Sequence, residues 1–146
     1  MIKPQDVVLA FWQCMHSNDF LAASDWLAEE FECFLPQSGE TIRCGWDYAM
    51  INIHFPSFGP WSFEVESLLA DGERVVSDVK ITDGIQVARV VTFSTVLEGK
   101  IVRQVEYWPE SFAAAEWRKE WTSQRTDSEL DLMPIERKHC IGSDIC

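Results

Sequence analysis

The sequence has few basic residues and no long apolar run. Lys and Arg number 12 against 24 Asp and Glu, which gives a formal net charge of −12. This charge repels phosphate backbones and anionic lipids, so we expect no nucleic acid and no membrane as partner. No apolar stretch approaches the roughly 18 residues of a membrane span. An acidic residue, Asp6, comes too early for a signal peptide. The sequence therefore predicts a soluble, cytoplasmic protein.

The cysteines are odd in number and lack the spacing of a disulfide framework. Five cysteines in that pattern fit a reducing compartment. His139 and Cys140, with Cys146 nearby, make only a weak metal motif, because a structural zinc site needs four ligands at closer spacing. The sequence also lacks a glycine-rich phosphate loop and a zinc signature. We therefore expect no metal and no cofactor.

The composition is typical of one globular domain with a sizeable core. The chain has 146 residues, and 47% of them are hydrophobic. Helical spacing of apolar residues predicts a helix over residues 4–18, and Asp19 is a suitable cap for a second helix over residues 20–28. A short strand is expected at residues 31–35. A third helix is expected at residues 46–55, ended by Pro56.

After Trp61 the pattern changes to the alternation that is typical of strands. Three dipeptides are typical of turns: Asp71-Gly72, Asp83-Gly84 and Glu98-Gly99. They divide this region into four antiparallel strands. Residues 86–96 are apolar on both sides, which predicts a central strand that is covered on both faces. The helices cover one face. A second copy of the chain would cover the other, so we expect a homodimer.

The end of the chain has a different composition. Pro109 ends the predicted sheet, and the aromatic residues after it predict a short helix at residues 112–121. We expect the folded domain to extend over residues 1–122. Residues 123–146 are mostly polar and are predicted to be a C-terminal tail.

Four segments in a fixed order carry a resemblance to a known superfamily. They read Cys-Met-His-Ser-Asn-Asp-Phe at residues 14–20, Leu-Ala-Glu-Glu at 27–30, Phe-Glu-Val-Glu at 63–66, and Gly-Lys-Ile-Val-Arg-Gln-Val-Glu-Tyr-Trp at 99–108. This order resembles the nuclear transport factor 2-like superfamily, especially its SnoaL-like branch. The resemblance implies an α+β fold, with helices packed on the concave face of a cone-shaped, curved antiparallel sheet. It implies no single function, because the superfamily includes isomerases, cyclases, epoxide hydrolases, dehydratases and binding domains.

The catalytic residues of two enzyme branches transfer only in part. Ketosteroid isomerases have a Tyr and an Asp that hold the oxyanion and an Asp that acts as base. At those positions this sequence has Phe11, Val91 and Leu35, which excludes that mechanism. Asp78 and Glu106 stand at the two acid positions of the limonene epoxide hydrolase branch. The water-holding residues of that branch have no match here.

Strand pairing suggests a cation between these two acids. With two-residue turns in both hairpins, Asp78 lies opposite Arg89, and Arg89 lies diagonal to Glu106 on the same face. We therefore predict Asp78, Arg89 and Glu106 as a catalytic set for acid–base chemistry inside an apolar cavity. The alternative is that Asp78 and Arg89 form an ordinary cross-strand ion pair at the solvated end of the sheet.

The predicted cavity lies under the first helix and would bind a small apolar or aromatic molecule. We predict six ligand-binding residues there: Phe11, Trp12, Trp46, His54, Val91 and Trp108. For His54 the alternative is a helix-end residue without contact to the ligand. The protein would act as an isomerase, cyclase, dehydratase or hydrolase. The alternative is a non-catalytic, dimeric ligand-binding or protein-association domain, and a cavity of a few hundred Å³ with converging charged groups favours the enzyme.

Overall fold

The computed structural model describes residues 2–125, and the chain divides into two compact units, residues 1–110 and 111–146. Most of the predicted tail, residues 126–146, lies outside the described residues, as do His139 and Cys140. None of the helices in the described part is long and apolar enough to span a bilayer.

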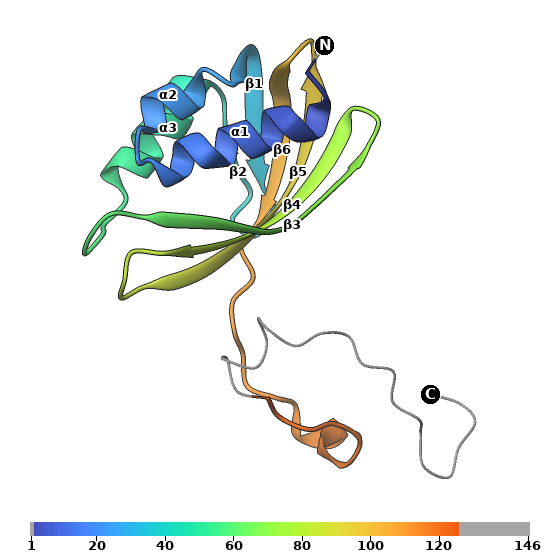
Figure 1. Ribbon diagram of the computed structural model, residues 1–146. Coiled ribbons are helices and arrows are strands. Elements are labelled where there is room, and N and C mark those ends of the chain that lie inside the picture. Colours follow the sequence, from blue (N-terminus) through green and yellow to red (C-terminus); the bar gives the residue numbers. More distant parts are fainter. Residues whose placement is uncertain (1, 126–146) are drawn as a thin grey trace. The chain divides into compact units, whose positions relative to one another are not determined.

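The first unit has three helices and six strands (Figure 1). In chain order they are α1 (Pro4–His16), α2 (Phe20–Ser24), β1 (Leu27–Leu35), β2 (Glu40–Ile42), α3 (Gly45–His54), β3 (Ser62–Asp71), β4 (Arg74–Thr82), β5 (Val87–Leu97) and β6 (Lys100–Tyr107). In the second unit, a 3₁₀ helix (Glu116–Trp121) stands where the sequence predicted a helix over residues 112–121.

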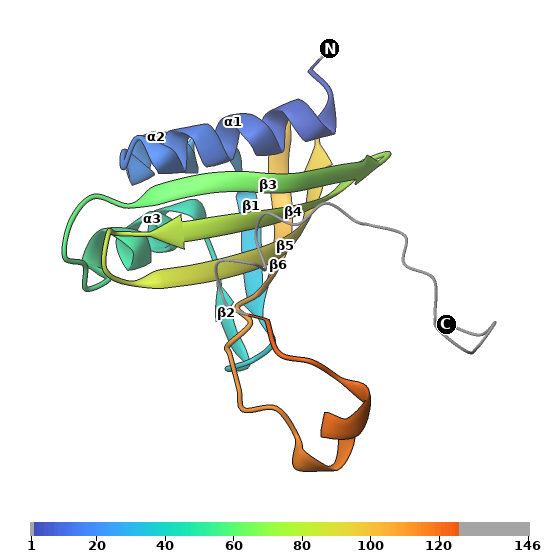
Figure 2. The same cartoon turned by 60° about the horizontal axis from the view of Figure 1, so that its bottom comes forward.

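The predicted α+β fold is confirmed. The strands form one curved sheet in the order β2-β1-β6-β5-β4-β3, with the helices on one face, which we call the inner face (Figures 1 and 2). β1 pairs with β6 in parallel, whereas an antiparallel sheet was expected throughout. The second helix ends at Ser24 and not at residue 28, because Leu27, Phe31 and Cys33 are buried at the spacing of a strand.

Helix α1 packs its apolar face on the sheet. The buried residues of α1 recur at helical spacing and are Val7, Val8, Phe11, Trp12 and Met15. The indole of Trp12 donates a hydrogen bond from Nε1 to Oγ of Ser77 in β4, at 3.1 Å. This buried hydrogen bond fixes the rotation of α1 over the inner face, and with it the wall that α1 gives to the cavity described below.

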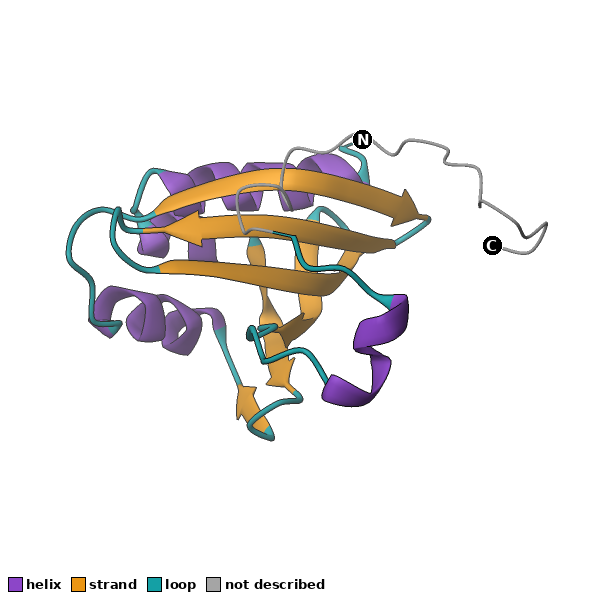
Figure 3. Ribbon diagram, turned by 90° about the horizontal axis from the view of Figure 1, so that it is seen from below, coloured by secondary structure: helices purple, strands orange, loops and turns teal. Residues whose placement is uncertain are grey.

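The turn between β4 and β5 is longer than predicted. Thr82 pairs with Val87, so the turn has four residues, 83–86, and not two. The carboxylate of Asp83 accepts hydrogen bonds from the backbone N–H groups of Ile85 at 3.0 Å and Gln86 at 2.6 Å. It also accepts one from Phe58 at 2.9 Å, which ties this turn to the loop between α3 and β3 (Figure 3).

Removing the Asp83 carboxylate is expected to loosen this end of the fold. Burial raises the pKa of Asp83, but the hydrogen bonds from Phe58 and Gln86 outweigh burial and hold that pKa below its ordinary value. Asp83→Ala should therefore lower the melting temperature by several degrees at pH 7, and the difference from wild type should shrink below about pH 4. Calorimetry with Asp71→Ala, at an exposed turn, is the control. Equal melting temperatures for both variants would contradict the expectation.

An extra residue in β6 decides which side chains face the helices. Val96 pairs with Ile101, but Thr95 pairs with Arg103, so Val102 is a β-bulge. A shift of one residue moves every later side chain of a strand to the other face. Glu106 therefore pairs with Thr92 and lies on the inner face.

Candidate active site

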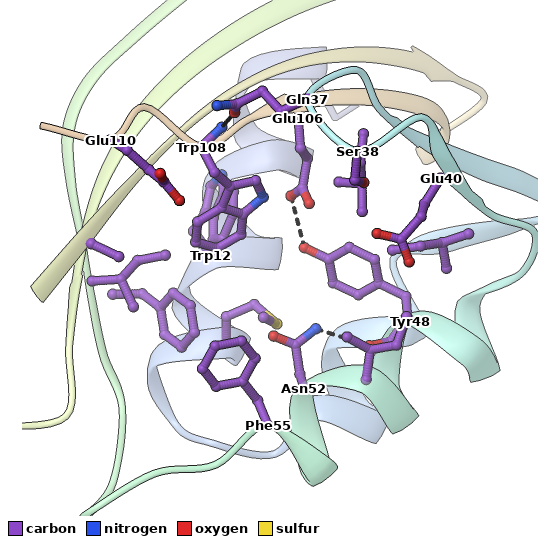
Figure 4. A pocket seen from close by; sticks show the side chains of 17 residues that line it. Trp12, Gln37, Ser38, Glu40, Tyr48, Asn52, Phe55, Glu106, Trp108 and Glu110 are labelled. Atoms are coloured by element: carbon purple, nitrogen blue, oxygen red, sulfur yellow. Dashed lines mark hydrogen bonds between the residues drawn. The ribbon is translucent and has the colours of Figure 1, made fainter. Parts of the chain in front are cut away.

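A cavity of about 480 Å³ opens between α1, α3 and the inner face of the sheet (Figure 4). Most of its walls are apolar side chains. Those of the helices, of the residue that follows α3 and of the strands β3 to β5 are Trp12, Met15, Ile51, Phe55, Phe63, Ile81 and Ala88. The polar and charged side chains of the lining are Gln37, Ser38, Glu40, Tyr48, Asn52, Glu106 and Glu110.

Glu106 is the buried acid of this cavity. Its exposed fraction is 2%, and its Oε2 accepts a hydrogen bond from the hydroxyl of Tyr48 at 3.0 Å. Burial raises the pKa of Glu106 to about 7, although hydrogen bonds from Tyr48 and Cys33 act to lower it. A carboxyl group with this pKa can both accept and donate a proton near neutral pH.

Tyr48 holds that carboxyl group from α3. Its ring lies between the rings of Phe11 and Phe31, with centroid distances of 5.8 Å to each. Burial raises the pKa of Tyr48 well above its ordinary value, and the charge of Glu106 raises it further. The phenol therefore stays protonated and remains a hydrogen-bond donor to Glu106.

Cys33 and Trp108 complete the surroundings of Glu106. Burial raises the pKa of the Cys33 thiol, and Glu106 raises it further, so Cys33 stays a neutral thiol. The backbone N–H of Trp108 donates a hydrogen bond to Oε1 of Gln37, which holds the end of β6 beside the loop between β1 and β2 (Figure 4).

No group of three His, Cys, Asp or Glu side chains among the described residues is arranged to hold a metal ion.

The predicted catalytic set is not assembled. Nη1 of Arg89 lies 2.7 Å from Oδ1 of Asp78 and 2.8 Å from Oε2 of Glu66. Arg89 and Asp78 lie on the sheet face opposite the helices, which we call the outer face, whereas Glu106 lies on the inner face. The prediction that Arg89 stands between Asp78 and Glu106 is therefore wrong. The longer turn at residues 83–86 shifts β5 by two residues and keeps Asp78 and Arg89 on one face, but the bulge at Val102 turns Glu106 away.

Arg89→Met is expected to change little. The Arg89 side chain is 28% exposed and that of Asp78 is 36% exposed, and such pairs contribute at most about 1 kcal/mol to the free energy of unfolding. Urea denaturation should show a change of that size, and the titration of Glu106 should stay where it is. A loss of several kcal/mol, or a shifted Glu106 titration, would show that Arg89 acts on the inner face after all.

Two of the six predicted ligand-binding residues line the cavity, Trp12 and Trp108. Phe11 is fully buried and packs edge to face on Trp12 outside the lining. Trp46 is 62% exposed, and His54 is exposed with Nδ1 2.8 Å from the carbonyl oxygen of Met50, as the helix-end alternative for His54 would have it. Neither residue lines this cavity. Val91 pairs with Tyr107 and points to the outer face.

Tyr48 was not predicted from the sequence. Residues of α3 are apolar on all sides of the helix, so the sequence pattern does not show which face is buried. The two residues predicted from this helix, Trp46 and His54, lie on its exposed side. One signal was present: Tyr48 and Asn52 are four residues apart and so share a face of α3. Nδ2 of Asn52 donates to the backbone oxygen of Tyr48 at 2.8 Å, and both side chains line the cavity.

Solved structures share this architecture. No family model and no curated protein matches the chain. A ketosteroid isomerase-like protein from Kribbella flavida is 27% identical, with a TM-score of 0.77 over 90% of this chain and 95% of that one. An NTF2-like protein of unknown function from Burkholderia xenovorans is 27% identical, with a TM-score of 0.69 over 84% and 95% of the two chains.

More distant structures show the same fold. An epoxide hydrolase of the LEH type from Mycobacterium tuberculosis is 18% identical, with a TM-score of 0.60 over 73% of this chain and 82% of that one. Polyketide cyclase-like proteins match at 17% and 20% identity. The reactions named for these proteins differ, so the shared fold does not determine the chemistry of this chain's cavity.

Proposed function

We propose that this chain, which has the fold of the nuclear transport factor 2-like proteins and their SnoaL-like branch, is an enzyme that moves a proton on a small apolar ligand. Glu106 is the group that takes and returns the proton. One observation carries the proposal, namely a carboxyl group that is 2% exposed, lines an apolar cavity of about 480 Å³ and has a pKa of about 7. Perturbed acids in clefts are candidates for catalysis.

The surroundings of Glu106 favour isomerisation or intramolecular cyclisation. In both reactions one carboxyl group can take a proton from one atom of the ligand and return it to another, so that no second reactant is needed. Tyr48 keeps the carboxyl group in place through its hydrogen bond of 3.0 Å. Hydrolysis by an acid–Arg–acid set has no support, because Asp78 and Arg89 are on the outer face. The structural similarity to a ketosteroid isomerase-like protein at 27% identity supports a proton-transfer reaction, although Phe11, Val91 and Leu35 stand where that enzyme branch has its catalytic residues, so Glu106 would act in another way.

Hydrogen exchange on an enolisable probe tests the proposal. The bicyclic ketone 2-tetralone is small enough for the cavity and loses protons next to its carbonyl group. In deuterated buffer, the wild-type protein is expected to accelerate this exchange, with a rate that rises as Glu106 ionises near pH 7. Arg89→Met is a matched control that should keep the wild-type rate. Exchange at the rate of buffer alone would overturn the proposal.

A second candidate is a non-catalytic, dimeric association domain, and the outer face favours it. Phe93 and Tyr107 are each 41% exposed there, and their rings meet edge to face at 6.1 Å. Exposed neighbouring aromatic side chains on a sheet are typical of an interface. The homodimer is compatible with either function, because the cavity lies on the inner face.

The dimer is expected to depend on this aromatic pair. Light scattering at micromolar concentration should give twice the chain mass of 16.8 kDa. Phe93→Glu should give the monomer mass, since it places a charge in the contact. Leu9→Glu, at a residue of α1 that is 39% exposed, is the control that should stay dimeric. A monomeric wild type would contradict the dimer.

A further inference from the structure

The charged residues of the cavity are all acids. Glu40, Glu106 and Glu110 line it, and no Lys, Arg or His side chain belongs to the lining within residues 2–125. Figure 4 shows Glu40 and Glu110 on opposite sides of the cavity, with Trp108 and Tyr48 between them. The basic side chains of the neighbouring strands face away, since Lys80 pairs with Arg89 on the outer face.

The apolar part of the lining is rich in aromatic rings. Trp12, Phe55, Phe63 and Trp108 all contribute to it. The faces of such rings carry partial negative charge and attract organic cations, most strongly where water is scarce. The aromatic rings and the carboxylates of the lining therefore both favour a positively charged ligand.

Helix α3 adds to this preference. The side chains of Ile51 and Asn52, in its last turn, line the cavity, so the C-terminal end of the helix is at the cavity wall. This end of a helix carries partial negative charge and favours cations. An anionic ligand would meet three acids and a helix C-terminus without a cation in the lining to offset them.

We propose that the ligand of this cavity is an organic amine, an aromatic or polycyclic molecule that carries one protonated nitrogen. The apolar frame of the ligand would fill the space between α1 and the sheet. Its ammonium group would lie at the ring of Trp108, between Glu110 on one side of the cavity and Glu40 on the other. The inference rests on the proposed function, because it assigns the substrate class of the same site.

Three probes of one shape and different charge test this inference. They are 2-naphthylmethylamine, which is a cation at pH 7, the neutral 2-naphthylmethanol and the anion 2-naphthoate. Titration calorimetry at low ionic strength should show the amine binding at least about tenfold more tightly than the alcohol, with naphthoate the weakest. The double variant Glu40→Gln/Glu110→Gln should remove most of the amine's advantage. Glu30→Gln/Glu73→Gln removes two exposed acids outside the lining and is the control, which should keep that advantage.

Proton linkage gives a second readout. Glu40 and Glu110 share the cavity with Glu106, while Tyr48 and Cys33 beside it stay neutral. Near pH 7 the bound amine should favour the ionised form of Glu106, so binding releases protons into the buffer. The bound alcohol should take protons up, because it removes water from the carboxylate. Calorimetry in buffers of different ionisation enthalpy measures the number of protons released on binding of the amine and the number taken up on binding of the alcohol.

The outcomes separate the two proposals. If the alcohol or naphthoate binds as tightly as the amine, or if the amine's advantage is equal in both double variants, the charge inference is wrong, whereas exchange on 2-tetralone would still support Glu106 as the acid–base group. If none of the three probes binds, the charge inference is wrong as well, and the proposed function is then decided by the exchange on 2-tetralone alone.

Discussion

Glu106→Gln is expected to lower the rate of exchange on 2-tetralone by at least about a hundredfold. Glutamine has nearly the same shape as glutamate, and its amide oxygen can still accept the hydrogen bond that Tyr48 donates at 3.0 Å. The cavity should therefore keep its form and its affinity for the probe. What the variant lacks is a group that accepts a proton near neutral pH.

The matched control for this variant is Glu32→Gln, at an exposed acid of β1. Proton nuclear magnetic resonance follows the exchange, and the intrinsic fluorescence of Trp12 and Trp108 follows binding of the probe, since both side chains line the cavity. Loss of exchange with binding retained would support Glu106 as the proton carrier. Equal exchange rates in Glu106→Gln and wild type would remove Glu106 from the reaction.

The same substitution is expected to stabilise the protein at pH 8, by about 3 kcal/mol in the free energy of unfolding. The pKa of Glu106 is raised from an ordinary 4.5 to about 7 in the folded chain. The folded state therefore holds a proton that the unfolded state has released between these two values. The free energy of unfolding of the wild type falls as pH rises from 4.5 to about 7, because the buried carboxyl group has to ionise. Above the folded pKa this loss of stability is complete. Glutamine carries no charge and avoids this cost.

Urea denaturation at pH 4.5 and at pH 8 measures this effect. At the lower pH, Glu106→Gln and wild type should differ little, and at the higher pH the variant should be the more stable of the two. Comparing the two proteins at each pH removes the contributions of the other acids, which are the same in both. A variant that is less stable than wild type by the same amount at both pH values would show that the carboxyl group is ionised and well solvated.

Much of the fold could be predicted because it depends on local patterns. The helical spacing after Pro4 and the alternation after Trp61 correctly placed α1 and the meander of β3 to β6. The superfamily resemblance predicted that the helices pack on one face of a curved sheet. The short strand β2 (Glu40–Ile42) was missed, because a segment of three residues has too little pattern to be recognised.

The candidate site was harder to predict because it depends on single residues of strand register. The Glu98-Gly99 turn was placed correctly, since Leu97 pairs with Lys100. The bulge at Val102 has no signal in the sequence, however, and it moves Glu106 to the other face. Glu106 was therefore predicted as a catalytic residue with the wrong partners, and Tyr48 was missed because α3 has apolar residues on all its sides and its pattern does not show which face is buried.

The titration of Glu106 itself tests the proposed proton transfer most directly. Carbon-13 labelling of the glutamate side chains, with Glu106→Gln to assign the signal, follows its carboxyl resonance from pH 4 to pH 9. We expect a midpoint of about 7, because the carboxyl group is buried beside Tyr48. A midpoint at the ordinary value of 4.5 would contradict the proposal, because a carboxylate that is fully ionised well below neutral pH is too weak a base for the proposed proton transfer.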